Sequence, residues 1–119
     1  MQVHQTIPIF RIFDEDKARA FYLGFLGLTL DWEHRFAPDL PLYAQVSRAG
    51  LTLHLSAHHG DGTPGSFAFV RMTGIADYHA ELLARNYAHM RPGIANQPWG
   101  QEMTVIDPFG STIRFCESA

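Results

Sequence analysis

Apolar residues occupy most positions of the first segment of the chain, from Val3 to Phe13, which is extended in character. One side of this segment carries Ile7, Ile9, Arg11 and Phe13, and the other carries Pro8, Phe10 and Ile12. A period of two predicts a β-strand, and the apolar residues on both sides indicate that both faces are covered.

A helix is predicted directly after this strand. Asp14 has the side chain of an N-cap, and Glu15 and Asp16 follow where a helix dipole favours negative charge. Helical spacing then aligns one apolar stripe, Ala18, Tyr22, Phe25 and Leu26. Gly27 is well placed to end the helix.

Three short strands are predicted over residues 28–35, 42–48 and 51–57, with Ala49-Gly50 as a tight hairpin turn. Residues 58–65 are rich in glycine, proline and aspartate and are interpreted as a linker. The same order then returns, with a strand at 66–72, a helix at 75–86, strands near 89–91, at 102–106 and at 112–117, and a turn at Asp107-Pro-Phe-Gly110. The second helix has its own apolar stripe, Ile75, Tyr78, His79, Leu82 and Leu83.

The chain therefore predicts an α+β fold of two βαβββ repeats, each a curved mixed sheet with one helix, over a repeat of about fifty-five residues. We expect one domain over residues 1–119, with repeats at about 1–57 and 66–119. Each half alone leaves a concave face and open edges to be covered.

Composition narrows the class of protein. With 119 residues, a net charge of −3 and 18% charged residues, the chain has no basic surface for nucleic acid, and no apolar run long enough to span a membrane. The N-terminus lacks an export signal, and the single cysteine, Cys116, is interpreted as a small core residue in a reducing compartment. We therefore expect a cytoplasmic protein.

Several ordered motifs carry a resemblance to a known family. The two repeats, with Asp14, Phe21-Tyr22 and Leu26-Gly27-Leu28 early and Asp107-Pro-Phe-Gly110 late, resemble the vicinal oxygen chelate superfamily. Together with that late turn, Leu30-Asp-Trp-Glu-His34, Leu53-His-Leu-Ser56 and Gln97-Pro-Trp-Gly100 are similar to the bleomycin resistance proteins. The resemblance implies the glyoxalase/bleomycin resistance fold and a homodimer that exchanges strands.

Two functions are open within that superfamily. Its enzymes hold a divalent metal with inward side chains from equivalent strands, whereas its resistance proteins sequester a drug without a metal. The resemblance places the enzymes' ligand positions on Ile7 and Arg114, and the internal repeat adds His54 and Ser66. An alkyl group has no lone pair and a guanidinium repels cations, so only His54 remains as a ligand where about three are needed.

A metal cluster of His54, His58, His59 and Asp61 is an alternative suggested by their order along the chain. On a continuous strand, however, His54 and His58 would lie about 13 Å apart. We therefore interpret His58 and His59 as part of a solvated linker. Glu33 and His34 are adjacent on a strand and point to opposite faces, which weakens them as an acid–base pair.

Aromatic side chains suggest a ligand site instead. By resemblance, Asp31 and Ser56 would contribute charge and a hydrogen bond, and aromatic residues would form walls on which a flat cation stacks. The full set of candidate ligand-binding residues is Asp31, Trp32, Phe36, His54, Ser56, Phe69, Trp99, Gly110 and Arg114. For each aromatic, core packing is the alternative, and Arg71 and Ser111 depart from the drug-binding pattern.

The sequence thus predicts a homodimer that sequesters a small aromatic or cationic compound, such as a bleomycin-type antibiotic, with no cofactor and no catalytic residue. The alternative is a metal-dependent lyase, isomerase or dioxygenase, which would recruit its ion through His54, Glu117 or a neighbouring chain. A relative that shares only the fold is a third possibility.

Overall fold

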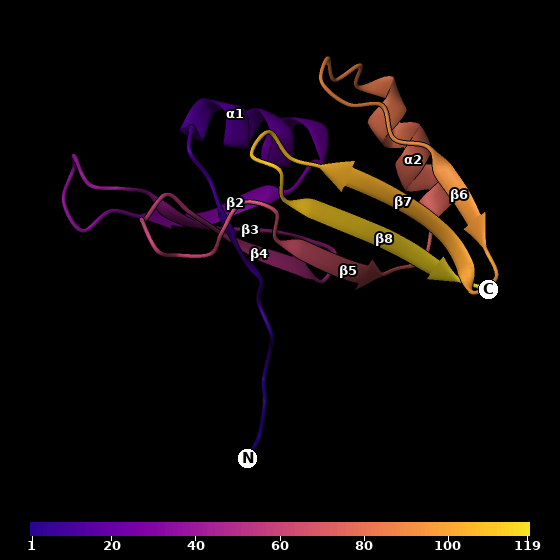
Figure 1. The fold of residues 1–119 in the computed structure, drawn as a ribbon, viewed down its shortest axis with the longest axis horizontal. Helices are drawn as coiled ribbons and strands as arrows, with labels where there is room; N and C mark the ends of the chain where they lie inside the picture. The colour runs from indigo at the N-terminus through magenta and orange to yellow at the C-terminus, as the bar shows by residue number, and fades with distance from the viewer. The chain divides into compact units, whose positions relative to one another are not determined.

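The computed structural model describes all residues from Met1 to Ala119, in two compact units, Met1–Pro64 (unit 1) and Gly65–Ala119 (unit 2). Each unit is a four-stranded mixed sheet with a helix on one face (Figure 1). The strand orders are β1-β4-β3-β2 and β5-β8-β7-β6, so the second unit repeats the first. This confirms the predicted pair of βαβββ repeats.

Unit 1 contains β1 (Ile9–Arg11), α1 (Glu15–Arg19), β2 (Thr29–His34), β3 (Tyr43–Arg48) and β4 (Leu51–Ser56). The helix continues beyond α1 as π-helical turns over Ala20–Phe25. Strand β1 runs parallel to β4, whereas β2, β3 and β4 are antiparallel neighbours.

The helix of unit 1 begins as its sequence predicts. The side chain of Asp14 accepts a hydrogen bond of 2.9 Å from the backbone N–H of Lys17, which caps the first turn. All four residues of the expected stripe, Ala18, Tyr22, Phe25 and Leu26, are buried. Alternate residues of the strands, including Leu53 and Val46, are buried as well, and Ala18 and Tyr22 line one small hollow together with Val46. The core of unit 1 therefore lies on the helix side of the sheet.

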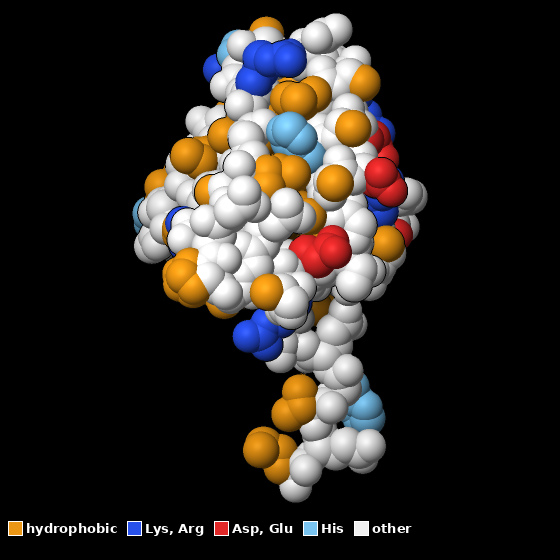
Figure 2. Space-filling view, turned by 90° about the vertical axis from the view of Figure 1, so that its right-hand side faces the viewer, with side chains coloured by type: hydrophobic (Ala, Val, Ile, Leu, Met, Phe, Trp, Pro, Cys, Tyr) orange, Lys and Arg blue, Asp and Glu red, His pale blue; other side chains and the backbone are white.

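The first strand is much shorter than predicted. Only Ile9–Arg11 pairs with β4, and residues 1–8 lie outside the sheet. Met1 and Val3 are exposed, and Figure 2 shows the N-terminal segment standing clear with apolar side chains on its surface. The expectation that both faces of this strand are covered is wrong for β1, since Phe10 is buried while Ile9 is exposed. The pattern also could not supply a pairing partner for the preceding residues.

Unit 2 contains β5 (Phe67–Arg71), α2 (Ile75–Ala84), β6 (Ile94–Gln97), β7 (Gly100–Ile106) and β8 (Thr112–Ser118). The strand predicted near 89–91 is wrong, because β6 begins at Ile94. Pairing of Gln97 with Gly100 makes Pro98-Trp99 the tip of a tight hairpin. The predicted turn at Asp107 is confirmed, since its side chain accepts the backbone N–H groups of Phe109 and Ser111.

A carboxylate from the last strand caps helix α2. The helix begins after Gly74, which has no side chain to cap it. Glu117 Oε1 accepts the backbone N–H of Gly74 at 2.6 Å and that of Ile75 at 2.9 Å. Glu117 thus takes the place of an N-cap side chain and ties β8 to α2.

The surface carries no continuous basic field on the face shown in Figure 2, where basic, acidic and apolar side chains are interspersed. No helix is long and apolar enough to cross a membrane.

Candidate ligand-binding site

An open cavity of about 420 Å³ lies in unit 1. Its walls are six side chains from β2, the loop after β2, the start of β3 and the loop after β4: Trp32, His34, Phe36, Tyr43, His58 and Asp61. Five of the six are rings and one is a carboxylate, a composition that suits a flat ligand with a positive or hydrogen-bond-donating edge.

The rings contact one another across the strands. Trp32 and Tyr43 are nearly parallel, with centroids 6.0 Å apart. Phe36 meets His34 edge to face at 4.7 Å and His58 at 5.8 Å. These contacts hold the walls together, yet Trp32 is 43% exposed and Phe36 is 76% exposed, so much of both rings is free to contact a ligand.

A β-bulge places Trp32 on the cavity side of β2. Leu30 pairs with Val46 of the core, and the register shifts before Trp32, which pairs with Gln45. Asp31 is the extra residue. If β2 paired regularly, with no bulge at Asp31, Trp32 would lie on the same face as Leu30, toward the helix.

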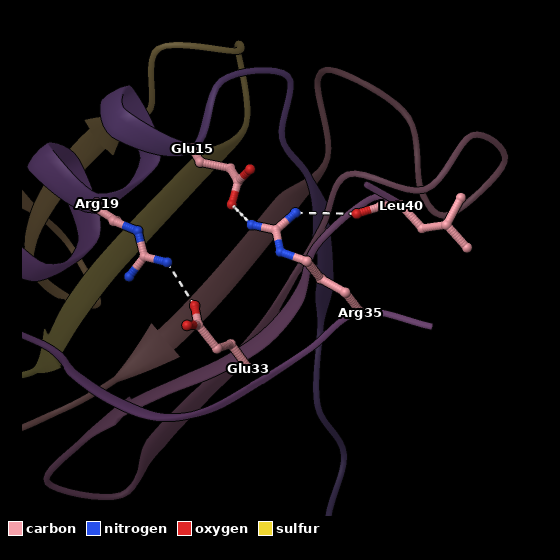
Figure 3. A network of polar contacts seen from close by, with 5 residues as sticks. All are labelled: Glu15, Arg19, Glu33, Arg35 and Leu40. Atoms are coloured by element: carbon pink, nitrogen blue, oxygen red, sulfur yellow. Dashed lines mark hydrogen bonds and ion pairs between the residues drawn. The ribbon is translucent and has the colours of Figure 1, made fainter. Parts of the chain in front are cut away.

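Ion pairs on the other face of β2 fix its end, as Figure 3 shows. Arg19 of α1 pairs with Glu33 at 2.5 Å, and Glu15 of α1 pairs with Arg35. Arg35 also donates to the carbonyl of Leu40 at 3.1 Å. With Glu33 held against the helix, its neighbour His34 points into the cavity, which confirms that these two residues face opposite ways.

The loop after β4 forms one wall, and the interpretation of His58 as part of a solvated linker is wrong. The buried hydroxyl of Ser56 donates to Asp61 at 2.9 Å and accepts the backbone N–H of His58 at 3.1 Å. The loop therefore turns back on the strand and brings both side chains to the cavity. His59 is exposed, as expected.

Four polar side chains form a hydrogen-bonded row beside the cavity. Gln45 contacts Asp31 at 3.1 Å and His54 at 3.0 Å, and His54 contacts the hydroxyl of Tyr43 at 2.7 Å. Hydrogen bonds from Ser47 and Gln45 lower the pKa of Asp31. Burial, and then the charge of Asp61, raise the pKa of Tyr43, so Asp31 is a carboxylate and Tyr43 a neutral phenol at neutral pH.

Burial lowers the pKa of His54 below its usual value of about 6.5. The unfolded chain therefore takes up this proton at a higher pH than the folded chain. The resulting contribution to stability is complete above about pH 6.5 and is lost as the pH falls through the folded-state pKa. We expect NMR to give His54 a midpoint below 6.5, and acidification to destabilise the wild type more than His54→Gln. A midpoint at or above 6.5 would contradict this.

In unit 2 the sequence-predicted residues form a separate arrangement. Trp99 is 57% exposed, and its indole N–H donates to the buried carboxylate of Glu102 at 2.8 Å. The guanidinium of Arg114 lies 4.9 Å from the ring centroid of Phe67, and its Nε is 3.3 Å from the hydroxyl of Thr104. Phe69 pairs with Arg114 across the strands and is exposed. Gly110 ends the turn at Asp107 with a φ of 91°.

The residues at the superfamily's metal positions do not fit a divalent ion. His54 pairs with Ile9, and Arg114 with Phe69, so the structural equivalent of Ile7 is Phe67, not Ser66. Neither Ile7 nor Phe67 has a donor atom, and Arg114 is a cation.

The donors of the alternative metal site are already engaged. Both ring nitrogens of His54 are hydrogen-bonded, and Glu117 caps a helix. No group of three histidine, cysteine or acidic side chains is arranged to hold an ion. The four residues weighed as an alternative metal cluster, His54, His58, His59 and Asp61, do not form one.

Sequence reasoning found Trp32 and Phe36 in the cavity wall but missed four of its members, His34, Tyr43, His58 and Asp61. Tyr43 could have been found, because it lies in the predicted strand at 42–48 on the side opposite Ala44 and Val46. Gln45 and Glu102, which hold His54 and Trp99, were also missed. Their partners lie on other strands, so the signal depends on register.

Comparison with known proteins confirms the predicted fold. A family model described as glyoxalase superfamily protein matches residues 1–119. A bleomycin-binding protein complexed with bleomycin has a TM-score of 0.72 at 20% identity, over 98% of this chain and 100% of that chain. The bleomycin resistance determinant encoded on transposon Tn5 has a TM-score of 0.74 at 18% identity, over 98% of each chain.

One solved structure described as that of an enzyme shares the same fold. A glyoxalase-related enzyme from Clostridium phytofermentans has a TM-score of 0.77 at 23% identity, over 100% of this chain and 98% of that chain. Among curated protein sequences, none matches this chain. At these identities the likeness to solved structures shows the fold and leaves the choice between binding and catalysis to the site.

Proposed function

Because the chain belongs to the glyoxalase superfamily, we propose that it binds and sequesters a flat aromatic cation, of the bleomycin type, without changing it. The observation that carries the proposal is the cavity of unit 1, in which rings make up five of the six walls and the sixth is the carboxylate of Asp61. Bleomycin-binding proteins of the same fold support this choice of ligand class.

The chemistry of the walls favours a planar cation. Stacking on an aromatic ring and attraction of a cation to an indole face each contribute on the order of 1 kcal/mol in a sheltered site. Trp32, Tyr43 and Phe36 offer such faces within one cavity. Asp61 adds a negative charge at the same place, whereas no lysine or arginine lines the cavity.

The cavity offers no arrangement for the metal chemistry of related enzymes. Its donors are two imidazoles and one carboxylate, and they are not grouped around one point. Binding without chemistry is therefore the function that these residues support.

Incubation with bleomycin tests the proposal directly. We expect the protein to bind bleomycin, to release it with unchanged mass on denaturation, and to bind it equally well after treatment with a chelator. Calorimetry would give the affinity and mass spectrometry the state of the drug. A modified drug, or near-stoichiometric zinc, nickel, manganese or iron in protein purified without chelator, would favour the enzyme alternative instead.

The proposal includes a cytoplasmic homodimer. Each unit exposes large apolar side chains, Ile9 and Phe13 in unit 1 and Phe67, Phe69 and Ile106 in unit 2, as surfaces that bind another subunit often do. Sedimentation equilibrium should then report twice the mass of the 13.4 kDa chain. Roles for Phe69, Trp99, Gly110 and Arg114 in ligand binding stay predictions alongside it.

A further inference from the structure

The hydrogen bonds that link Asp31, Gln45, His54 and Tyr43 beside the cavity all run in one donor-to-acceptor direction. Its first member, Asp31, is a carboxylate that only accepts hydrogen bonds. Gln45 must therefore turn its amide nitrogen toward Asp31, at 3.1 Å, and its amide oxygen toward His54 Nε2, at 3.0 Å. The orientation of the amide follows from the charge of its partner.

The proton positions on His54 and Tyr43 follow in turn. Because the oxygen of Gln45 only accepts, His54 Nε2 carries the hydrogen. In a neutral imidazole Nδ1 is then an acceptor, so the hydroxyl of Tyr43 donates to it, at 2.7 Å. The lowered pKa of His54 agrees with a neutral ring.

Tyr43 has only one hydroxyl proton, and that proton is donated to His54 Nδ1. Toward the cavity that Tyr43 lines, its oxygen is consequently an acceptor. The other oxygen-bearing wall, Asp61, also accepts. His34 presents a donor or an acceptor according to its tautomer, and Nε2 of His58 is buried, so neither ring selects one kind of ligand.

Resting on the proposed function, we infer that Gln45 is a specificity-determining residue, although it lies outside the cavity wall. Through it, the cavity selects flat ligands that bear N–H donors over flat ligands of equal charge that have none. Gln45 acts through His54 and Tyr43 and is a positioning residue that touches no ligand.

Two dyes of matched shape and charge provide the test. 9-Aminoacridine is a planar monocation with N–H donors, and 10-methylacridinium is a planar monocation without them. Stacking and net charge are common to both, so the ratio of their affinities isolates the hydrogen bonds. We expect the wild type to bind 9-aminoacridine about tenfold more tightly.

Two variants should reduce this preference. Tyr43→Phe keeps the ring and removes the acceptor. Gln45→Lys presents only donors to His54 Nε2, which moves the hydrogen to Nδ1 and turns the outward side of Tyr43 into a donor. Both variants should lower the affinity ratio to about threefold or less, and the preference that remains is that of Asp61, which still accepts hydrogen bonds. Gln97→Lys adds the same charge on an exposed strand of unit 2 and should keep the wild-type ratio.

Nitrogen-15 NMR of the His54 ring gives a readout independent of any dye. We expect the Nε2–H tautomer in the wild type and Nδ1–H in Gln45→Lys. An Nδ1–H tautomer in the wild type, or equal affinities for the two dyes, would overturn the role of Gln45 while leaving the aromatic site intact. Failure of both dyes to bind would overturn the proposed function, and the donor selection with it.

Discussion

Trp32→Ala is expected to weaken binding of 9-aminoacridine by roughly 30-fold, the largest effect on affinity of any single wall residue. The substitution removes both a stacking surface and an indole face for the cation, on the order of 1 kcal/mol each. Trp32 is 43% exposed, so the fold should lose little stability, within about 1 kcal/mol. Calorimetric titration and a denaturant melt would measure the two quantities.

Phe13→Ala is the matched control, because Phe13 is an exposed aromatic of unit 1 that does not line the cavity. It should leave the affinity unchanged. An equal loss in both variants would mean that binding depends on general surface hydrophobicity and not on this cavity. Trp99→Ala separately tests the predicted contribution of unit 2, and a loss there would extend the site to the hairpin of β6 and β7.

Gly100→Ala should destabilise unit 2 by about 3 kcal/mol, the largest effect on stability expected from a single methyl group in this chain. Gly100 has a φ of 152°, and a Cβ built there would lie 2.2 Å from the backbone carbonyl oxygen of Glu117. The neighbouring atom belongs to the backbone of β8, so relief requires the two strands to separate. Chemical denaturation would measure the loss.

Gly93→Ala provides the control, because a Cβ there would meet no atom within 4 Å. Its free energy of unfolding should change by less than about 0.5 kcal/mol. Equal effects of the two substitutions would show that loss of glycine flexibility, not the close approach of β7 and β8, sets the cost. Because Glu117 also caps α2, Gly100→Ala should lower the helix signal together with the sheet.

Local patterns were sufficient for most of the elements. The stripe from Ala18 to Leu26 identified the first helix, and positive φ at Ala49 and Gly50 matches the predicted hairpin. These features depend on neighbours within a few residues, which a sequence displays directly. The strand at Ile94–Gln97 was not predicted, because it is short and mostly polar and forms a strand through its pairing with β7.

The site was harder to predict because it depends on contacts between distant residues. The bulge at Asp31 reverses the side on which Trp32 lies, and nothing in the sequence Leu30-Asp-Trp-Glu-His34 marks it. His58 lines the cavity because its backbone N–H donates to the hydroxyl of Ser56. The glycine-rich sequence around it does not predict this hydrogen bond. Register and loop conformation are properties of the folded chain. The sequence pattern therefore indicated aromatic residues for the site but not which of them line the cavity.

The segment from Ala57 to Gly65 both lines the cavity and connects the two units. It supplies His58 and Asp61 to the cavity, and it is the covalent tether across the boundary between the two units at Pro64. Residues inserted after Gly60 would thus lengthen the tether and displace a wall in one step, whereas an insertion at Ala49-Gly50, on the far end of β3 and β4, would do neither. Only residues inserted after Asp61 would therefore lengthen the tether without also changing the ligand site.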